Sequence, residues 1–256
     1  MGHKIFRIIE IIIEISASAC VIAGVAQLFE KKTNKHKPKG IYEKFFKRVL
    51  DVFLSTGVLI VLSPIIAATA ILVRIKHGSP VVYVQERPGK DEKIFKIFKF
   101  RTMTNETDCN GKLLPDEQRL TKFGSTLRKT SLDEILELVN IIRGDMAIIG
   151  PRPLLVRYLD RYNEEQRHRH DVRPGLTGYA QAHGRNTVSW DDKFAMDVWY
   201  TKNVTFKNDI KILLDTVKTV FKREGISSET SATMEEFMGT LEGAKTEWTA
   251  PDRNCN

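Results

Sequence analysis

The chain has 256 residues and a mass of 29.2 kDa, enough for one catalytic domain with attached segments and too short for three or more independent domains. A hydrophobic share of 42%, a charged share of 28% and a mean hydropathy of −0.25 exclude wholesale disorder, a coiled-coil rod and a transporter with many membrane spans. The net charge of +8 indicates an anionic partner (nucleic acid, lipid head groups or phosphorylated small molecules), and three widely spaced cysteines exclude a disulfide framework and favour a reducing compartment.

The first apolar stretch, from Ile5 to Phe29, is interrupted by Arg7, Glu10 and Glu14. A carboxylate near the centre of a membrane-spanning helix costs about 2–3 kcal/mol, so the stretch either crosses a membrane or lies in its interface. Its length and the two glutamates disfavour a cleaved signal peptide. If the stretch crosses, the basic residues that follow place its C-terminal end in the cytoplasm.

The second apolar stretch, from Val52 to Val73, contains 22 residues without a charge. As one straight helix it would be about 33 Å long, enough to cross a bilayer core. Ser63 and Pro64 stand in its middle, and an interior proline removes a backbone hydrogen bond, so the sequence predicts a bend or break there. Three structures remain open: a re-entrant hairpin, a proline-kinked transmembrane helix and a buried core helix.

The charges on either side of this stretch favour the re-entrant hairpin. Eight Lys and Arg residues lie between positions 31 and 48, and eight more lie between positions 74 and 101. Because basic flanks prefer the cytoplasmic side of a membrane, two equally basic flanks are best satisfied if the helix turns at Ser63-Pro64 and returns to the same face. The backbone carbonyls at such a turn need more partners than the Ser63 hydroxyl can supply, so protein or water must provide the others.

A β-hairpin is predicted next in the chain. Residues 80–86 are rich in Val and Tyr, residues 87–90 supply turn chemistry, and residues 94–103 read as a second strand. Lys99 and Arg101 would point to one side of that strand, where they form either a solvated charged face or a grip on phosphate. The polar residues 104–118 predict a loop.

Three helices are predicted in the remaining chain, over residues 132–142, 154–169 and 208–223. The last is basic and amphipathic, a pattern that fits a membrane surface or a core-facing helix equally well. Residues 168–171, His-Arg-His-Asp, are interpreted as a solvated helix end rather than a metal site. The polar tail from residue 227 is predicted to be loosely ordered.

The segment Ser131-Leu132-Asp133-Glu134 carries the densest chemistry. Ser131 and Glu134 have the spacing of a capping box at the start of the helix 132–142. Asp133 has no structural role in that motif. The free backbone N–H groups and the helix dipole at the first helical turn would favour the ionised form of its carboxylate. An ionised carboxylate can ligate a hard cation such as Mg²⁺ or attack phosphorus as a nucleophile.

Arginines cluster around this segment. Arg128 lies just before it, Arg143 precedes Gly144, and Arg152 lies between Pro151 and Pro153; Arg185 follows further along the chain, in Gly-Arg-Asn. The two prolines make the segment around Arg152 stiff and extended, which suits a phosphate clamp, although a structural turn with a surface ion pair fits as well. The sequence contains no Walker loop, Gly-x-Gly-x-x-Gly fingerprint or nucleophile elbow.

Six motifs in this order resemble the bacterial sugar transferase family, the monotopic phosphoglycosyl transferases, over residues 44–226. They are Phe98–Met103, Leu127–Glu134, Asn140–Met146, Gly150–Pro153, Pro174–Gly178 and Gly184–Asn186. The later Trp190, Lys193, Asp197–Tyr200 and Glu224–Ser227 are similar to the small members that start bacterial N-linked glycans on a diacetylbacillosamine phosphate.

The resemblance implies transfer of a phospho-sugar from a UDP-sugar to polyprenol (undecaprenyl) phosphate, with release of UMP. It implies that Asp133 is the nucleophile of a covalent phospho-sugar intermediate and that Glu134 assists beside it, with Mg²⁺ as cofactor held by both. Lys99, Arg128 and Arg152 match basic site positions of the family and Asp209 matches a site carboxylate, while Arg185 is added as a contact to the nucleotide and Arg101 as a supporting residue.

The break at Ser63-Pro64 matches the family's re-entrant helix. One departure is that Ile135, Leu136 and Glu137 stand where the family often has Leu-Pro-Gln.

The expected fold is α/β (α+β), membrane-associated and mostly helical, with a small β-hairpin, a re-entrant membrane helix and interfacial amphipathic helices. Residues 1–40 form an N-terminal helix and basic linker, 41–76 the re-entrant helix, 77–226 a cytoplasmic catalytic domain and 227–256 a polar tail. The expected partners are a UDP-sugar, polyprenol phosphate and membrane lipid, with no nucleic acid. The UDP-sugar is expected to carry an N-acetylated amino sugar, as UDP-diacetylbacillosamine does. Binding of a second copy of the chain is left open. The expected location is the bacterial inner membrane, with the catalytic domain on the cytoplasmic face.

Two other functions remain open at this stage. A conventional glycosyltransferase would release UDP instead of UMP. A polybasic membrane-associated binding protein without catalysis would have no use for Asp133, and its binding would weaken with salt.

Overall fold

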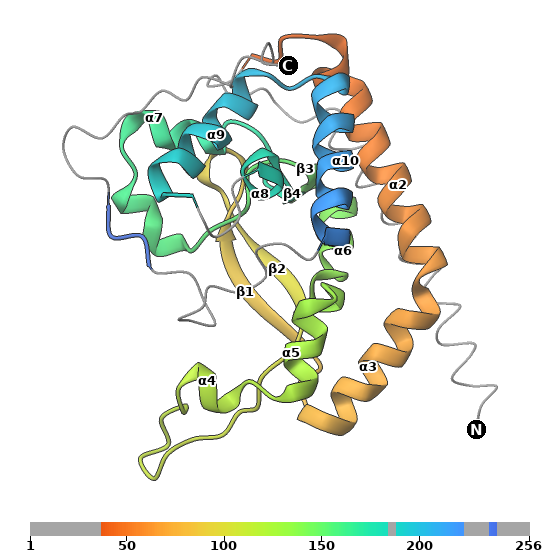
Figure 1. Cartoon of the computed structure of the whole chain (residues 1–256), viewed down its shortest axis with the longest axis vertical. Helices are drawn as coiled ribbons and strands as arrows, with labels where there is room; N and C mark the ends of the chain where they lie inside the picture. The colour runs from red at the N-terminus through yellow and green to blue at the C-terminus, as the bar shows by residue number, and fades with distance from the viewer. Residues whose placement is uncertain (1–36, 184–187, 223–235, 240–256) are drawn as a thin grey trace. The chain divides into compact units, whose positions relative to one another are not determined.

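The computed structural model describes residues 37–183, 188–222 and 236–239 (Figure 1). These residues are mostly helical and carry two small sheets, β1–β2 and β3–β4, so the predicted helical fold with a small β-hairpin is confirmed. The chain divides into two compact units. The first holds residues 41–85 and 96–147, and the second holds residues 37–40, 86–95 and those from 148 onward. The apolar stretch 5–29 and Arg185 lie outside the described residues.

The first unit begins with two helices that meet at a break (Figure 1). A π-helical turn, Tyr42–Phe46 (η1), leads into α2 (Lys47–Val61), and α3 (Ser63–His77) follows at an angle of 64°. The predicted break at Ser63-Pro64 is confirmed: Leu62 has φ −88° and ψ 3°, and Pro64 lies in the first turn of α3, where its missing N–H removes no helical bond. The Ser63 hydroxyl donates to the Ile60 carbonyl at 2.8 Å.

Within the described residues, no single helix is both long enough and apolar enough to cross a membrane. The bent pair Tyr42–Val61 and Ser63–His77 reaches the required length and composition only when taken together.

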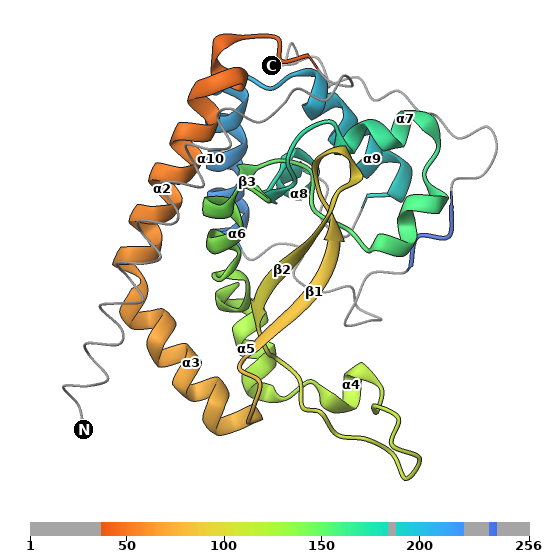
Figure 2. The same ribbon diagram turned by 180° about the vertical axis from the view of Figure 1, so that it is seen from behind.

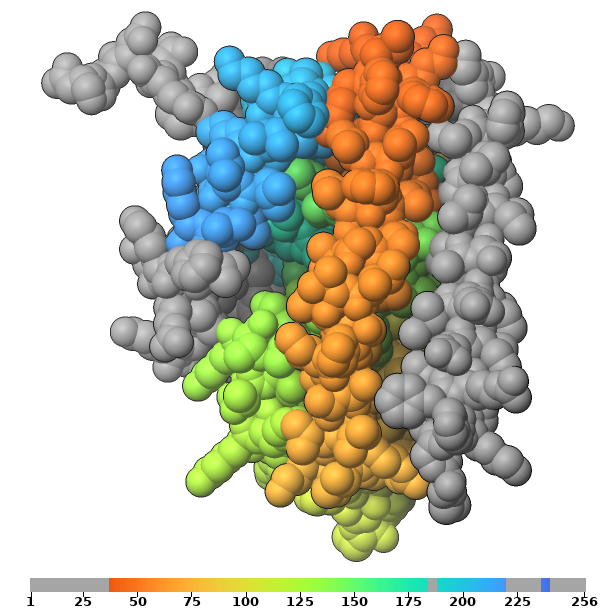
Figure 3. Space-filling view, turned by 90° about the vertical axis from the view of Figure 1, so that its right-hand side faces the viewer, coloured from red at the N-terminus to blue at the C-terminus, as the bar shows by residue number. Residues whose placement is uncertain are grey.

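The polarity of α2 is the reverse of that of a helix on the surface of a globular protein. Its buried side chains are Arg48, Asp51 and Ser55, whereas Phe53 and Val61 are each 74% exposed. In the space-filling view of Figure 3, the α2–α3 pair forms one continuous orange strip on the surface of the molecule. The apolar face of this pair therefore points away from the rest of its unit.

Arg48 joins α2 to α6 (Glu137–Arg143), and Figure 2 shows the two helices side by side. Its guanidinium donates to the carbonyls of Ile141 and Ile142 at 2.6 and 2.9 Å. These carbonyls belong to the last turn of α6, where few backbone donors are left; the Gly144 N–H also donates to the Ile141 carbonyl at 3.0 Å. Gly144, with φ 92°, then ends α6 in the left-handed conformation that glycine adopts without strain.

The predicted hairpin is confirmed with shifted ends: β1 comprises Val82–Pro88 and β2 comprises Ile94–Phe100 (Figure 2). Its tip carries a short 3-10 turn, Lys90–Glu92 (η2). The predicted loop after β2 contains one short helix, α4 (Asp116–Arg119). Helix α5 (Lys122–Lys129) follows, and its first turn is capped by Thr121, whose hydroxyl accepts from the Gly124 N–H at 2.9 Å.

The expected capping box at Ser131 is wrong. Ser131 has a left-handed conformation with φ 55° and makes no side-chain cap, and the segment after it is a single 3-10 turn, Leu132–Glu134 (η3). The α-helix therefore starts at Glu137, not at Leu132. A capping residue needs an extended backbone, which Ser131 does not have. The next residue, Leu132, instead packs against the cluster of Val73, Phe100 and Leu127.

The second unit pairs β3 (Ala147–Ile149) with β4 (Gly175–Thr177). The two segments approach so closely that a Cβ on Gly175 would lie 2.1 Å from the Gly150 nitrogen. The Gly150 N–H donates to the Thr177 carbonyl at 2.9 Å, and the Gly175 N–H donates to the Pro151 carbonyl at 3.0 Å. The glycines of two sequence motifs thus allow a direct contact between two backbone segments.

The predicted helix 154–169 is wrong as a continuous element. The chain forms a 3-10 helix, Val156–Arg161 (η4), then α7 (Glu164–Arg167) and a 3-10 turn, His168–His170 (η5). Asn163 explains the interruption, because its side chain and that of Gln166 form a reciprocal capping box that starts a new helix. The interpretation of residues 168–171 as solvated is also wrong in part: His168 is exposed, but Arg169 and His170 are buried.

Three helices complete the second unit: α8 (Tyr179–His183), α9 (Trp190–Lys202) and α10 (Phe206–Lys222). The predicted amphipathic helix near the end of the chain is confirmed as α10, in which Ile212 is fully buried. A row of apolar side chains on α10 is at least one-third exposed: Phe206, Ile210, Leu213, Leu214 and Val217.

The tail contains a packed segment. Phe237 is 2% exposed and belongs to the aromatic core of this unit with Tyr158, Tyr162 and Phe194. The prediction of a loosely ordered tail is therefore wrong for residues 236–239. An isolated Phe in a polar stretch gave no periodic signal that could have predicted this packing.

Gly124 offers a test of the packing between α5 and the residues that directly follow β2. A Cβ at this position would lie 1.8 Å from the Thr102 carbonyl oxygen, so we expect Gly124→Ala to lower the free energy of unfolding by about 2 kcal/mol or more. Gly57→Ala is the matched control, because a Cβ there meets nothing within 4 Å. In a helix interior alanine is more favourable than glycine by up to about 1 kcal/mol, so this variant should not be destabilised. Thermal unfolding in detergent, followed by circular dichroism, measures both. Equal melting temperatures for the two variants would contradict the contact.

Candidate functional site

The turn η3 carries a cluster of carboxylates around one lysine. Lys99, on β2, lies 2.6 Å from Glu134 Oε1 and 3.0 Å from Glu137 Oε1, measured from its Nζ. Asp133 lies on the same turn and is 8% exposed. The first unit therefore brings together two of the predicted catalytic residues and one predicted phosphate-binding residue.

The environment of Asp133 perturbs its titration. Its pKa is raised to about 6, first because burial disfavours the charged carboxylate and second because Glu134 is negatively charged. Lys99, Arg128 and the backbone N–H of Asp133 all act in the opposite direction. The backbone N–H groups of η3 do not lower the pKa below its ordinary value as expected, because η3 is one 3-10 turn and burial outweighs its amides, but a carboxyl group with a pKa of about 6 is still mostly ionised at neutral pH.

Arg128 faces the same carboxyl group from the end of α5. Its positive charge lowers the pKa of Asp133, and its Nε donates to the Thr102 hydroxyl at 3.1 Å. The close approach of Gly124 to Thr102 brings α5 near enough for this bond. Asp133 is therefore a buried carboxyl between an acidic neighbour and two cations, an arrangement that is common in catalytic sites.

Two residues that support this cluster were not assigned a role from the sequence. Glu137 is 3% exposed and shares Lys99 with Glu134. Asn140 is fully buried; its Nδ2 donates to the Lys96 carbonyl at 2.7 Å and its Oδ1 accepts from the Phe98 N–H at 3.1 Å. Asn140 thus holds α6 against the strand that carries Lys99. The three-residue spacing from Glu134 to Glu137 was the one signal in the sequence, since it places two carboxylates on one side of a helical turn.

The side chain of Arg101 binds backbone carbonyl groups of the protein. Its guanidinium donates to the carbonyls of His77, Ser79 and Met103 at 2.6, 2.9 and 2.8 Å. These contacts tie the end of α3 to the end of β2. Arg101 therefore supports the cluster through the backbone, and its donors are directed at carbonyl oxygens instead of a phosphate.

The other predicted site residues that the structure describes, Arg152 and Asp209, belong to the second unit. Arg152 is exposed between the buried Pro151 and Pro153, and its carbonyl accepts from Arg169 at 2.7 Å. Asp209 is 3% exposed at the start of α10, and its Oδ1 lies 2.8 Å from the Tyr200 hydroxyl.

Arg169, which sequence reasoning missed, holds the backbone of Arg152. It is 2% exposed and forms a buried ion pair with Asp197 at 2.7 Å. Its guanidinium also lies over the rings of Tyr162 and Phe194, at 5.7 and 5.6 Å from the ring centroids. The adjacent His170 is neutral at physiological pH, because burial and the charge of Arg169 lower its pKa to about 3.

Across residues 37–183, 188–222 and 236–239, no three or more His, Cys, Asp and Glu side chains are arranged as a metal site. The carboxylate oxygens of Asp133 and Glu134 are nevertheless the donor type that Mg²⁺ prefers, and their mutual repulsion favours a cation between them.

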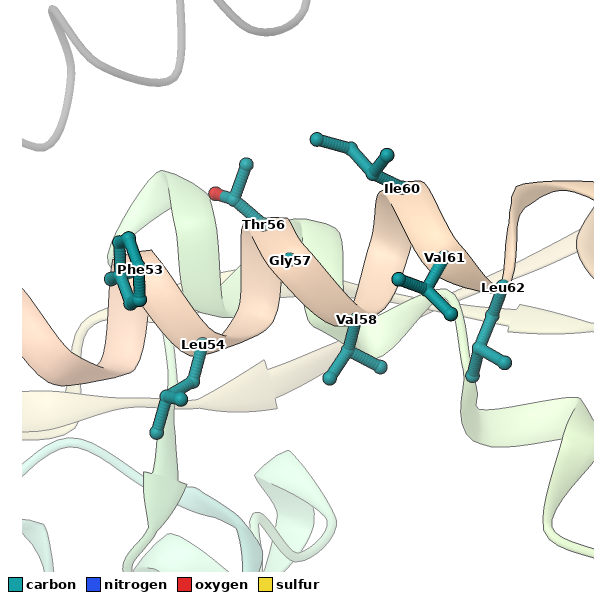
Figure 4. A pocket seen from close by; sticks show the side chains of 8 residues that line it. All are labelled: Phe53, Leu54, Thr56, Gly57, Val58, Ile60, Val61 and Leu62. Carbon is teal, nitrogen blue, oxygen red and sulfur yellow. The ribbon is translucent and has the colours of Figure 1, made fainter.

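A hollow of about 570 Å³ runs along the outer face of α2 (Figure 4). Figure 4 shows apolar side chains projecting from this helix, and none of the carboxylate cluster lines the hollow. The lining residues are Phe53, Leu54, Thr56, Gly57, Val58, Ile60, Val61 and Leu62.

Comparison with known proteins identifies the family. The profile of the family described as "bacterial sugar transferase" matches residues 42–223. The chain belongs to the bacterial sugar transferase family. The resemblance inferred from the six motifs is confirmed, and the match includes the turn η3, the hairpin and the bent α2–α3 pair.

Several relatives of this sugar transferase carry informative names. EpsL of Bacillus subtilis (strain 168), described as an uncharacterized sugar transferase, is 50% identical over 194 residues, which cover 76% of this chain and 96% of EpsL. The undecaprenyl-phosphate galactose phosphotransferase of Salmonella typhimurium is 36% identical over 199 residues, 71% of this chain and 42% of that protein. The UDP-N-acetylgalactosamine-undecaprenyl-phosphate N-acetylgalactosaminephosphotransferase of Aeromonas hydrophila is 32% identical over 204 residues, 77% of this chain and 48% of that protein. The sugar transferase thus spans less than half the length of the two relatives whose names specify a reaction.

The raised pKa of Asp133 has a consequence for the stability of this sugar transferase. Because the folded protein binds the proton more tightly than the unfolded chain, Asp133 contributes stability below pH 3.8 that is lost as the pH rises through about 6. We expect Asp133→Asn to be more stable than the wild type at pH 7.5, by about 1–3 kcal/mol, and nearly equal to it at pH 4. Thermal unfolding of both proteins at the two pH values measures the difference.

The control for this experiment is Asp116→Asn, since the side chain of Asp116 is 59% exposed and lies on α4. We expect no pH-dependent difference from the wild type for this variant. An Asp133→Asn protein that is less stable than the wild type at pH 7.5 would contradict the cause given for the raised pKa.

Proposed function

We propose that this protein transfers a phospho-sugar from a UDP-sugar to polyprenol (undecaprenyl) phosphate and releases UMP. The observation that carries the proposal is the buried Asp133, with a pKa of about 6, between the charges of Glu134, Lys99 and Arg128. A carboxyl group with this pKa is mostly ionised at neutral pH and keeps a higher basicity than an exposed aspartate. The reactions in the names of the Salmonella and Aeromonas relatives support the same class of enzyme, an undecaprenyl-phosphate sugar phosphotransferase.

The reaction we infer has two displacements at one phosphorus atom. In the first, an Asp133 carboxylate oxygen attacks the phosphorus that bears the sugar; an oxygen–phosphorus bond to Asp133 forms, the bond to the UMP oxygen breaks, and UMP leaves. In the second, an oxygen of polyprenol phosphate attacks the same phosphorus; the bond to Asp133 breaks, and the products are polyprenol diphosphosugar and the regenerated carboxylate.

A carboxylate that approaches an anionic diphosphate is repelled by its negative charge. The positive charges of Lys99 and Arg128 reduce this repulsion. Both cations already oppose the rise in the pKa of Asp133, so both act on the atom proposed to react. Lys99 is also held by Glu134 and Glu137, which orients its ammonium group. We assign further phosphate contacts to Arg152 and Arg185, and a supporting role to Asp209.

Mg²⁺ is the cofactor that we propose for this site, held by Asp133 and Glu134. Two carboxylates suffice, because Mg²⁺ in proteins commonly binds one or two carboxylates and completes its shell with substrate phosphates and water. When bound, the ion would neutralise charge on the diphosphate.

We propose that the α2–α3 pair inserts into the cytoplasmic leaflet of a bacterial inner membrane as a re-entrant hairpin. The exposed apolar face of α2, the buried polar residues on its other side and the bend of 64° all support this placement. The exposed apolar row on α10 supports a second, interfacial contact. The carboxylate cluster would then act at the membrane surface, where a polyprenol phosphate presents its head group.

The donor sugar that we propose is an N-acetylated amino sugar, such as diacetylbacillosamine. The resemblance of Asp197–Tyr200 to the small family members supports this choice, and the N-acetylgalactosamine in the name of the Aeromonas relative supports an amino sugar more generally. The galactose in the name of the Salmonella relative makes UDP-galactose the necessary comparison in any donor panel.

The proposed intermediate is tested by mass spectrometry of the intact protein. The protein is incubated with Mg²⁺ and each of several UDP-sugars in the absence of polyprenol phosphate. We expect one donor to add the mass of its phospho-sugar to the protein and to release UMP, and we expect Asp133→Asn to give no adduct and to lose at least about 10³-fold in turnover.

The control for this test is again Asp116→Asn, which should form the adduct and turn over at the wild-type rate. Release of UDP would identify a conventional glycosyltransferase. Full turnover by Asp133→Asn would rule out the proposed nucleophile, and an Asp133→Asn protein that keeps membrane binding while the wild type lacks activity with every donor would favour a polybasic binding protein.

The proposed membrane placement is tested through the break between α2 and α3. Replacing Ser63 and Pro64 by leucine removes the residues that end α2, so we expect the two helices to merge into one long enough to span the bilayer. Single cysteines at Glu43 and Lys76, in a protein whose own cysteines are serine, report the side of each flank through labelling by a membrane-impermeant maleimide.

In the otherwise unchanged sequence, both flanks should label from the cytoplasmic side. In the leucine variant, the two flanks should label from opposite sides. Labelling of both flanks from one side in both proteins would show that Ser63-Pro64 does not determine the topology, and labelling from opposite sides in the unaltered break would exclude the re-entrant hairpin.

A further inference from the structure

The packed segment near the C-terminus occupies a pocket made of aromatic rings. Phe237 lies against four rings that we call the aromatic socket: Tyr158, Tyr162, Trp190 and Phe194, with ring centroids at 5.7, 5.8, 5.7 and 4.8 Å. All four belong to η4, α9 and the residue after η4, within the second unit. A single side chain from a distant part of the sequence therefore completes this core.

The contacts around Phe237 bind a peptide and not only a ring. Arg157 and Arg161 form ion pairs with the two carboxylate oxygens of Glu236, at 2.9 and 2.8 Å. Arg161 also donates to the Phe237 carbonyl, and the Phe237 N–H donates to the Tyr158 hydroxyl at 3.2 Å. The socket and its two arginines thus bind an acidic side chain, an aromatic side chain and both backbone groups of one residue, as peptide-recognition sites do.

The socket is connected to Arg152 through one buried residue. The rings of Tyr162 and Phe194, which contact Phe237, also lie beneath the guanidinium of Arg169. Arg169 in turn donates to the Arg152 carbonyl. Because buried aromatic side chains are close-packed, removing Phe237 allows Tyr162 and Phe194 to shift, and Arg169 loses the surface that orients it.

We propose that the aromatic socket is a binding site for an acidic-aromatic peptide segment, filled in this chain by Glu236-Phe237-Met238, and that its occupancy positions Arg152. Phe237 is then a positioning residue, because it acts on Arg152 only through the rings and Arg169. The consequence for catalysis rests on the proposed function, in which Arg152 contacts a phosphate of the donor. The peptide binding and the positioning do not depend on that function.

The first experiment measures binding to full-length Phe237→Ala protein, whose own segment no longer fills the socket. The probe is a fluorescent peptide of residues 231–242, and the control peptide carries Ala in place of Phe237. We expect saturable binding of the first peptide and none of the second by fluorescence anisotropy. The wild-type protein should bind the peptide at least about tenfold more weakly, because its tethered segment competes at a high effective concentration.

The second experiment follows the backbone around Arg152 by hydrogen–deuterium exchange. We expect residues 150–154 to exchange faster in Phe237→Ala than in the wild type, and to return toward the wild-type rate when the peptide is added. Phe237→Tyr, which keeps the ring, should behave as the wild type. Asp116→Asn is the control, since its side chain is 59% exposed and lies in the first unit, and it should leave the exchange unchanged.

The third measurement separates binding from chemistry. If Arg152 contacts the donor before reaction, Phe237→Ala should raise the KM for the UDP-sugar about tenfold and change kcat by less than about threefold, and the peptide should restore KM. A merely unstable variant would instead lose kcat in proportion to the unfolded fraction, which the unfolding curve measures.

Absence of peptide binding to Phe237→Ala would overturn the socket as a recognition site. Binding without any change in exchange at residues 150–154 would overturn the positioning of Arg152. Wild-type protein that forms no product with any donor would instead contradict the proposed function, while the binding and exchange results would still decide the inference.

Discussion

The contact on which the first unit depends is that of the Arg48 guanidinium with the carbonyls of Ile141 and Ile142. The last carbonyls of any α-helix need partners from outside the helix, and a buried end without them is unstable. Charged donors contribute about 1.5–3 kcal/mol per hydrogen bond, so this one side chain sets where α6 ends against α2. From that end, Asn140 ties α6 to β2, and β2 carries Lys99 to the carboxylates of η3. The acidic turn is therefore positioned by a residue from another helix of its unit, α2.

The carboxylate cluster combines burial, which opposes charge, with cations that restore it. Burial and a second carboxylate would raise the pKa of an aspartate further if nothing opposed them, and a fully compensated carboxylate would have the weak basicity of an exposed aspartate. Lys99 and Arg128 leave the pKa of Asp133 at about 6, between these limits. A nucleophile at this value is ionised and still basic. The balance depends on two cations from different elements, β2 and α5, and hence on the close contact of Gly124 with Thr102.

Local chemistry made the break, the hairpin and the acidic turn predictable. A proline inside an apolar run, strand residues around a turn and an ordered set of short motifs each act over a few residues, and the structure has the break and both strands near the expected positions. The errors arose where tertiary contacts override local preference. The capping box at Ser131 failed because Leu132 packs inward, and the helix 154–169 was interrupted because Asn163 and Gln166 form a capping box that starts a new helix after Tyr162. The roles of Arg48 and Arg169 gave no sequence signal, since a polar residue that binds a distant backbone carbonyl looks like any surface residue, and Asn140 was noted only as the start of a family motif.

The rotation of α2 about its axis is restrained from two sides at once. Arg48, Asp51 and Ser55 recur at intervals of three and four residues, so they form one buried polar stripe, while Phe53 and Val61 lie on the opposite face. Turning the helix would place the guanidinium of Arg48 among apolar groups, which costs several kcal/mol for an uncompensated charge, and would remove its hydrogen bonds to the carbonyls of Ile141 and Ile142. A purely apolar helix would have no such preference, because every rotation would bury similar side chains. The polar stripe therefore gives α2 a defined orientation against α6, and through it gives the acidic turn a defined position relative to the exposed apolar face.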